Sequence, residues 1–156
     1  MKTGILFDIE ECAIHESNSL CISIFMKGCP LRCSWCHSPE GQKCEIEKIK
    51  RKNGDLLVIG EEWSSSRLAS YIDDMNDIFR GCIVFTGGEP LMQADFLLEV
   101  FSKIKKNCND MIIETCGIGD VNKLVELSKH CSKIHFGLKL IDESKNLKHV
   151  GVSSRS

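Results

Sequence analysis

Residues 25–41 read FMKGCPLRCSWCHSPEG, and they place Cys29, Cys33 and Cys36 directly after an apolar segment. An iron–sulfur cluster usually takes four protein ligands, commonly four cysteine thiolates. Three thiolates are one short of that number. They leave one iron free to bind a small molecule, much as catalytic zinc sites keep an open position. The spacing therefore predicts a reactive iron–sulfur centre held by these three cysteines.

Two other interpretations of the cysteines stay open at this point. A zinc site could recruit His37 or Cys44 as its fourth ligand, although structural zinc sites are usually built from two separated pairs and no second C-x2-C pair occurs. A disulfide framework is the other, because the chain has 10 cysteines. Such frameworks are mostly found in short secreted chains, and no secretory signal is expected here.

The remaining cysteines and histidines are expected to be structural. Cys82 and Cys116 lie in or beside apolar segments, where a free cysteine behaves as a small hydrophobic residue. Four histidines show no spacing typical of metal ligands and are expected at the surface or in the sheet: His15, His130, His135 and His149.

Length and composition bound the class of protein. A chain of 156 residues is expected to form a single domain, residues 1–156, with a substantial core. The formal net charge of -2 offers no basic field for nucleic acid. The longest apolar run, residues 20–26, is far shorter than the roughly 20 residues that span a bilayer. We therefore expect a cytoplasmic protein without a nucleic-acid or membrane partner.

Apolar segments typical of strands alternate with amphipathic segments typical of helices. Strands are predicted at residues 20–26, 82–86, 111–115 and 134–140, and helices at residues 64–79, 95–106 and 120–129. Asn53-Gly54 between two strand-like runs predicts a small hairpin excursion over residues 45–60. This order predicts an α/β fold with a parallel sheet of about four core strands.

Chemically distinctive residues follow each predicted strand of this sheet. The cysteine loop follows the first strand, TGGEP (residues 86–90) ends the second, ETCG (residues 114–117) ends the third, and Lys139 lies near the end of the fourth. Paired glycines let the backbone approach a ligand without a Cβ in the way. Because ligands bind beyond the carboxyl ends of parallel strands, these segments are expected to form one site.

The Cys-x3-Cys-x2-Cys spacing, with Trp35 before the third cysteine and TGGEP on a later strand, resembles the radical S-adenosylmethionine (SAM) superfamily. More narrowly, GCPLRCSWCHSPEG, TGGEPLMQADFLLEV, ETCG and LKLIDESKNLKHVGVS are similar to segments of the glycyl-radical-enzyme activating enzymes. The resemblance covers nearly the whole chain. It implies a parallel partial (β/α) barrel of the radical SAM type.

The resemblance also implies cofactors and a reaction. Cys29, Cys33 and Cys36 would hold a [4Fe–4S] cluster, and SAM would chelate its fourth iron. The enzyme would be an anaerobic oxidoreductase that reductively cleaves SAM and abstracts a glycine hydrogen from a partner glycyl radical enzyme. Flavodoxin or ferredoxin would donate the electron.

Further residues match the SAM-binding positions of this family. Three of them, Gly87, Gly88 and Glu89, match the strip that contacts the methionyl amino group. Glu114 matches an acidic SAM ligand, and Lys139 matches a lysine near the methionyl carboxylate. Trp35 matches a residue whose backbone lies near the adenine.

Two alternatives follow from the shortness of the chain. The family barrel has six strands, and this chain is expected to be C-terminally shortened, with about four. A truncated, catalytically inactive cluster-binding paralogue is therefore one alternative. A radical SAM enzyme that acts on a small molecule is the other.

Overall fold

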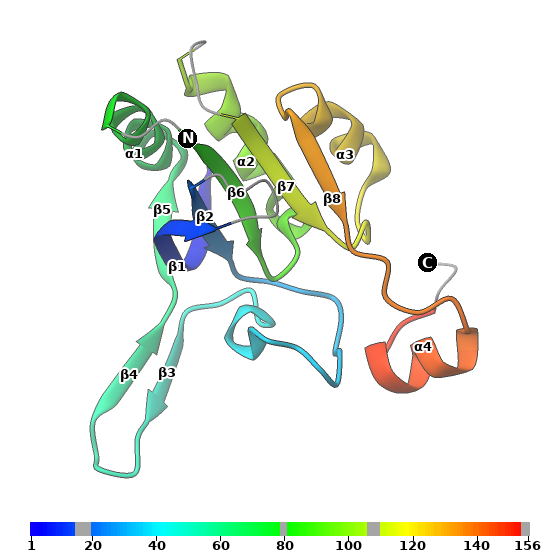
Figure 1. The fold of residues 1–156 in the computed structure, drawn as a ribbon. Coiled ribbons are helices and arrows are strands. Elements are labelled where there is room, and N and C mark those ends of the chain that lie inside the picture. Colours follow the sequence, from blue (N-terminus) through cyan, green and yellow to red (C-terminus); the bar gives the residue numbers. More distant parts are fainter. Residues whose placement is uncertain (15–19, 79–80, 106–109, 154–156) are drawn as a thin grey trace.

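The computed structural model describes residues 1–14, 20–78, 81–105 and 110–153, which form an α/β fold around a central sheet (Figure 1). The described strands of this sheet lie in the order β5-β1-β2-β6-β7-β8, and β3 and β4 pair separately as a hairpin. The strands are β1 Thr3–Ile14, β2 Leu20–Met26, β3 Glu47–Lys50, β4 Leu56–Ile59, β5 Glu61–Ser64, β6 Cys82–Gly87, β7 Asp110–Thr115 and β8 Lys133–Phe136.

The four strands predicted from apolar runs form the parallel part of the sheet. β2 pairs with β6, β6 with β7 and β7 with β8, in each case in parallel. The fourth strand is shorter than predicted and ends at Phe136. Just beyond it, the Leu138 amide bonds to the Phe136 carbonyl two residues earlier, so the backbone turns and leaves the ladder. The prediction of strand structure over residues 137–140 is therefore wrong.

Two antiparallel strands, which the sequence did not predict, extend the sheet beyond β2. β1 pairs with both β2 and β5 in antiparallel register. Apolar and acidic residues alternate only over residues 7–10 of β1, and the pairing of β1 with β2 shifts register twice. Cys12, at the second shift, has a positive φ of 66°. Such bulges break the period-two pattern by which strands are recognised.

Three helices cover one face of the sheet and enclose the core (Figure 1). They are α1 Ser65–Ile78, α2 Ala94–Lys103 and α3 Val121–Ser128, close to the predicted helices. Asp120 caps the start of α3, because its side chain accepts from the Asn122 amide. Phe85 of β6 meets Phe101 of α2 edge to face, with ring centroids 5.1 Å apart. Burial of each such ring stabilises the fold by about 1.5–3 kcal/mol. No described helix is long and apolar enough to cross a membrane.

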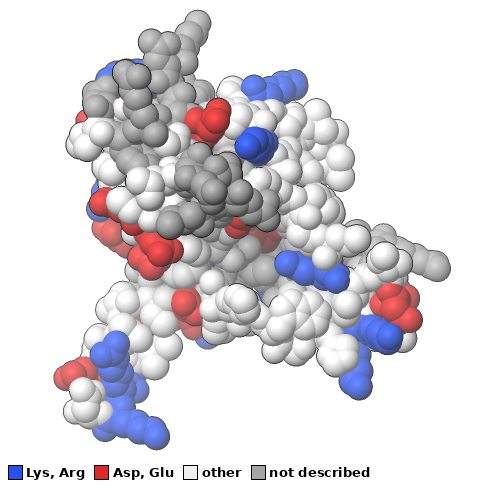
Figure 2. Space-filling view, in the orientation of Figure 1, with Lys and Arg blue, Asp and Glu red and all other residues white. Residues whose placement is uncertain are grey.

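Two smaller elements lie beyond the carboxyl ends of the parallel strands (Figure 1). The predicted hairpin is confirmed as β3 and β4, and Gly54 at its turn has a φ of 94°. Lys and Arg side chains gather on this hairpin (Figure 2), where residues 48–52 contribute four of them. The fourth helix, α4 Glu143–Val150, was not predicted. It lies near the C-terminal end of the described chain (Figure 1).

A disulfide joins Cys21 of β2 to Cys82 of β6. The two residues are register partners on neighbouring parallel strands, with Cα atoms 4.4 Å apart. The prediction that Cys82 is a free apolar side chain is therefore wrong. Its partner lies 61 residues earlier in the chain, and only the strand register brings the two together.

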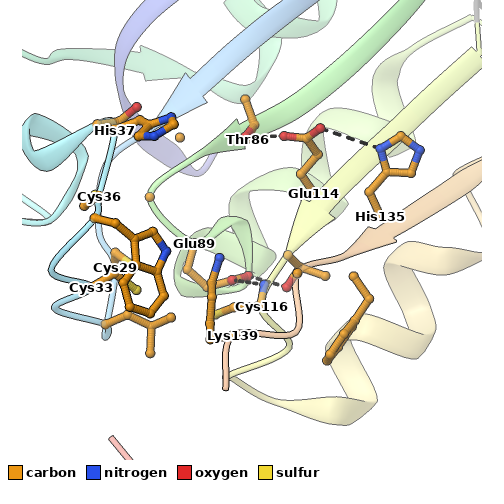
Figure 3. Close-up of a pocket in the computed structure, with 18 residues that line it drawn as sticks. Cys29, Cys33, Cys36, His37, Thr86, Glu89, Glu114, Cys116, His135 and Lys139 are labelled. Atoms are coloured by element: carbon orange, nitrogen blue, oxygen red, sulfur yellow. Dashed lines mark hydrogen bonds and ion pairs between the residues drawn. The ribbon is translucent and has the colours of Figure 1, made fainter. Parts of the chain in front are cut away.

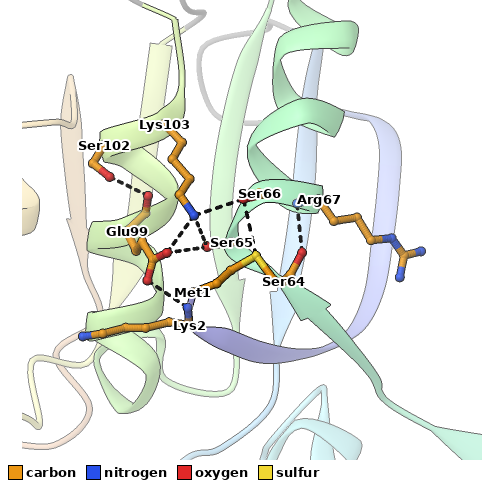
Figure 4. A network of polar contacts seen from close by, with 9 residues as sticks. All are labelled: Met1, Lys2, Ser64, Ser65, Ser66, Arg67, Glu99, Ser102 and Lys103. Atoms are coloured by element: carbon orange, nitrogen blue, oxygen red, sulfur yellow. Dashed lines mark hydrogen bonds and ion pairs between the residues drawn. The ribbon is translucent and has the colours of Figure 1, made fainter.

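A polar network around Glu99 ties the N-terminus to α1 and α2 (Figure 4). The Glu99 carboxylate accepts from the Lys2 amide at 2.8 Å and from the Ser65 hydroxyl at 2.9 Å. Lys103 lies 2.7 Å from the same carboxylate. The hydrogen bond from Lys103, followed by those from Lys2 and Ser65, lowers the pKa of Glu99 from 4.5 to about 2.

We expect Glu99→Gln to destabilise the fold at neutral pH. The folded-state pKa of Glu99 is depressed, so its contribution is present above about pH 4.5 and is lost as the pH falls toward about 2. The difference in urea stability between wild type and variant should shrink over that range. Glu126→Gln, an exposed carboxylate of α3, controls for loss of charge. A difference that does not change with pH would contradict this account.

Candidate functional site

A cavity of about 610 Å³ opens at the carboxyl ends of the parallel strands (Figure 3). Its volume lies within the range of small-molecule sites. Figure 3 shows the three cysteines on one side of this cavity and Glu114 and His135 on the other. All of the site residues proposed from the sequence line it: Cys29, Cys33, Trp35, Cys36, Gly87, Gly88, Glu89, Glu114 and Lys139.

The cysteine loop, residues 28–42, is tied down at its base and near its middle. At the base, the Gly28 amide donates to the Gly41 carbonyl at 2.8 Å and the Cys29 amide donates to the Gln42 carbonyl at 2.9 Å. Near the middle, the amides of Arg32 and Ser34 each donate at 2.8 Å to a carbonyl in the last turn of α4. The unpredicted helix α4 therefore braces the loop, and it satisfies its own C-terminal carbonyls in doing so.

The three loop thiols are free and share one electrostatic environment. Cys29 and Cys33 are half-buried, and Cys36 is exposed. Burial is the largest cause that raises the pKa of the Cys29 thiol, and the charges of Glu89, Cys33 and Cys36 raise it further. Burial also raises the pKa of Cys33, while Lys139 opposes that shift. A bound metal centre would favour the thiolate form of these cysteines, and its binding would release their protons.

The thiol donors of the cysteine loop are compatible with a cluster. Within the part of the chain that the structure describes, no three His, Cys, Asp or Glu side chains are gathered so as to hold one metal ion. A cluster binds each thiolate through a different iron, so its ligands need not converge on one point. His37 lines the cavity, whereas Cys44 is not among its lining residues. The three free thiols that line one cavity therefore fit a [4Fe–4S] cluster.

Gly87 and Gly88 allow the strand-end loop of β6 to pack against the base of the cysteine loop. Gly87 has a φ of 103°, which glycine adopts without strain. A Cβ on Gly88 would collide with the Gly28 carbonyl and would lie 2.6 Å from that of Gly41. In this close approach, the Gly88 amide donates to the Met26 carbonyl and the Glu89 amide to that of Gly28, both at 2.7 Å.

The Glu89 carboxylate is buried and already hydrogen-bonded by the protein. Only 1% of the residue is exposed. One carboxylate oxygen accepts from the Thr115 hydroxyl at 2.6 Å and the Leu91 amide at 3.0 Å, and the other accepts from the Cys116 amide at 2.7 Å. Glu89 therefore locks the end of β6 to the end of β7. A contact of residues 87–89 with the methionyl amino group stays a prediction.

Glu114 is oriented from two sides. Its carboxylate accepts from the Thr86 hydroxyl at 2.8 Å and lies 3.6 Å from Nδ1 of His135. His135 is the register partner of Glu114 on β8. The sequence left His135 without a site role because a lone histidine has no spacing signal. Only the pairing of β7 with β8 places it in the cavity.

Lys139 and Cys116 complete the inner wall. Lys139 lies beyond the end of β8, and its ammonium folds back over Gly137, where a Cβ would lie 3.2 Å from Nζ. Cys116 lines the cavity and is half-buried, so it is not enclosed in the core as the sequence suggested. Burial and then the charge of Glu89 raise the pKa of Cys116 to about 12, which keeps its thiol protonated at neutral pH.

The chain is similar in sequence to a protein family and to several curated proteins. A family model described as "4Fe-4S single cluster domain" matches residues 18–142. Similar curated proteins include the isethionate sulfite-lyase activating enzyme of Oleidesulfovibrio alaskensis, which is 24% identical over 97% of this chain and 66% of that protein. The trans-4-hydroxy-L-proline dehydratase activating enzyme of Clostridioides difficile is 26% identical over 96% of this chain and 65% of its own length.

Two further similarities concern shorter stretches. The pyruvate formate-lyase 2-activating enzyme of Escherichia coli is 27% identical over 90% of this chain and 55% of its own length. The crystal structure of QueE from Escherichia coli superimposes with a TM-score of 0.56 at 22% identity, over 76% of this chain and 55% of QueE. This likeness supports the fold alone. The chain spans between 55% and 66% of the lengths of the curated relatives named here.

We expect Gly88→Ala to displace the cysteine loop. The added methyl group meets backbone carbonyls that cannot rotate away, so overpacking should cost about 1–3 kcal/mol of stability in urea unfolding. Gly54→Asn serves as the control, because a Cβ there meets nothing within 4 Å and asparagine tolerates a positive φ. Equal stability of Gly88→Ala and wild type would show that the close approach is not a constraint.

Proposed function

Because this chain belongs to the 4Fe-4S single cluster domain family, we propose that it is a radical SAM activating enzyme that removes a hydrogen atom from a glycine of a partner glycyl radical enzyme. The observation that carries the proposal is the shared cavity. Three free thiols face the same space as the glycine strip of β6, Glu114 and Lys139. The activating-enzyme relatives support the reaction class.

Each wall of the cavity has a distinct part in this proposal. Cys29, Cys33 and Cys36 would hold the [4Fe–4S] cluster, and the chemistry that the bound cluster supplies is one-electron cleavage of SAM. The amino-acid part of SAM carries an ammonium and a carboxylate. Glu114 and Lys139 supply the opposite charges within the same cavity. Thr86 and His135 contact the Glu114 carboxylate and, in this proposal, would orient it for that ammonium.

The partners belong to the same proposal. The proposed protein substrate is a glycyl radical enzyme, which the relatives support because their names describe the activation of another enzyme. The proposed electron donor is flavodoxin or ferredoxin. Trp35, which is 46% exposed, would offer its backbone near the adenine. The exposed side chains of Trp35 and Cys36 leave this wall of the cavity accessible from outside.

The first test is SAM cleavage. Protein reconstituted anaerobically with iron and sulfide should produce 5′-deoxyadenosine when SAM and a chemical reductant are added, as measured by chromatography. Cys33→Ala should lose the cluster absorbance and the product, whereas Cys131→Ser, outside the cavity lining, should keep both. Product from wild type that does not exceed Cys33→Ala would sink the proposal and leave a cluster-binding protein without turnover.

A second test separates SAM binding from cluster binding. Glu114→Gln and Lys139→Met each remove one charge that faces SAM, and loss of a charged hydrogen bond should weaken SAM binding about 10- to 100-fold. Iron and sulfide content should remain at the wild-type value. Lys133→Met, at the opposite end of β8, is the matched control for loss of a lysine charge. Unchanged SAM affinity in both cavity variants, measured by calorimetry, would contradict these roles.

A further inference from the structure

Lys27 is a fully buried lysine beside the cysteine loop. It follows the last residue of β2 and lies two residues before Cys29. Its side chain has 0% exposure, and Nζ donates to the Glu40 carbonyl at 2.6 Å and to a Glu47 carboxylate oxygen at 2.9 Å. A buried charge is costly unless it is paired and hydrogen-bonded, so these partners are what permit an ammonium here.

The ammonium joins three segments that meet at the base of the cysteine loop. Lys27 belongs to the outgoing limb. Glu40 lies in the returning limb, in the short 3-10 helix η1 Pro39–Gly41. Glu47 is the first residue of β3. The backbone bonds of Gly28 to Gly41 and of Cys29 to Gln42 join the same two limbs. The side chain of Lys27 therefore closes the loop at the point where the first cluster cysteine begins.

The surroundings hold Lys27 in this one position. Its carbonyl accepts from the side chain of Gln93 at 2.7 Å, and its amide donates to the Ile5 carbonyl at 2.9 Å. Gly60 leaves room for the lysine stem, because a Cβ there would lie 2.8 Å from Cδ of Lys27. Hydrogen bonds from Lys27 and then Lys43 hold the pKa of Glu47 below its usual value, so the Glu47 carboxylate is ionised at neutral pH.

We propose that Lys27 is a positioning residue for the iron–sulfur cluster, which rests on the proposed function. Its ammonium orders the cysteine loop before the cluster binds, so that three thiols face one cavity. The loop has little apolar burial to order it, since Leu31 is buried but Trp35 and Cys36 are exposed. A loop ordered by hydrogen bonds at its base has already lost the entropy that binding would otherwise cost, which is how supporting residues strengthen a metal site.

A purely structural role would have a different signature. A buried ion pair adds little net stability compared with neutral groups of similar shape, whereas removal of one partner leaves an unpaired charge. Lys27→Met alone would therefore combine the loss of the lysine's hydrogen bonds with a Glu47 carboxylate that has lost its buried charge partner. The double variant Lys27→Met/Glu47→Gln removes both charges, so its fold should be nearly as stable as wild type. It still lacks the donor to the Glu40 carbonyl, so it tests the positioning role while fold stability is measured separately.

The experiment compares iron retention in the whole chain. Wild type, Lys27→Met/Glu47→Gln, Glu47→Gln and Lys43→Met are reconstituted anaerobically, and iron loss to a chelator is followed by visible absorbance without SAM. Lys43 is the matched control because it contacts the same Glu47 carboxylate at 2.9 Å but is 60% exposed and does not bond to the loop. Thermal unfolding of each cluster-free protein gives stability separately.

We expect the double variant to unfold near the wild-type temperature but to lose iron about 10-fold faster or more, the size of effect seen for residues that support metal ligands. Lys43→Met should lose iron at about the wild-type rate, whereas Glu47→Gln, which leaves the buried Lys27 without its opposite charge, should lose iron faster than wild type. Wild-type iron retention in the double variant would overturn the positioning role, and so would iron loss that only parallels lost stability. A wild-type chain that holds a cluster but does not cleave SAM would overturn the proposed function alone.

Discussion

The close approach of three backbone segments at Gly88 is the constraint on which the site depends. Gly88 lies against the carbonyls of Gly28 and Gly41, with no room for a side chain. This contact brings the end of β6 against both limbs of the cysteine loop and aligns the bonds from Gly88 to Met26 and from Glu89 to Gly28. Because backbone atoms cannot rotate away, the packing sets where the thiols stand relative to the sheet. The buried ammonium of Lys27 closes the same junction from the other side.

Charged groups around the cavity divide into those that build it and those that face into it. Glu89 and Lys27 are buried, and their polar atoms are occupied by protein partners, so they connect segments of the chain. Glu114 and Lys139 line the cavity, and in the proposed function they meet the two charges of the methionyl group. This division follows from burial. A buried charge must be paired within the protein, whereas a group at a cavity wall can still exchange water for a ligand.

Local patterns predicted the parallel strands, the three covering helices and the hairpin, because apolar period and turn chemistry are local properties. They did not predict β1, whose acidic residues and bulges obscure its alternation. They also missed α4, although Asp142 caps its start and Gly151 ends it in a left-handed conformation. That helix is short, and its last carbonyls are satisfied by the cysteine loop rather than by a local pattern. The disulfide between Cys21 and Cys82 was also missed, because only the register of β2 with β6 brings these two residues together.

The chemistry proposed for the cavity could be predicted from short segments that are recognisable alone: the three-thiol spacing, the paired glycines, Glu114 and Lys139. The contacts that each side chain makes there depend on the fold. In the fold, Glu89 is buried and accepts a hydrogen bond from Thr115, and His135 lies against Glu114 on the neighbouring strand. Lys27 is buried at the base of the cysteine loop, where it pairs with Glu47. The physical reason is that burial and partnership arise from strand register and loop packing, which join residues far apart in the chain. A side chain's type is a local property, but its hydrogen-bond partners are not.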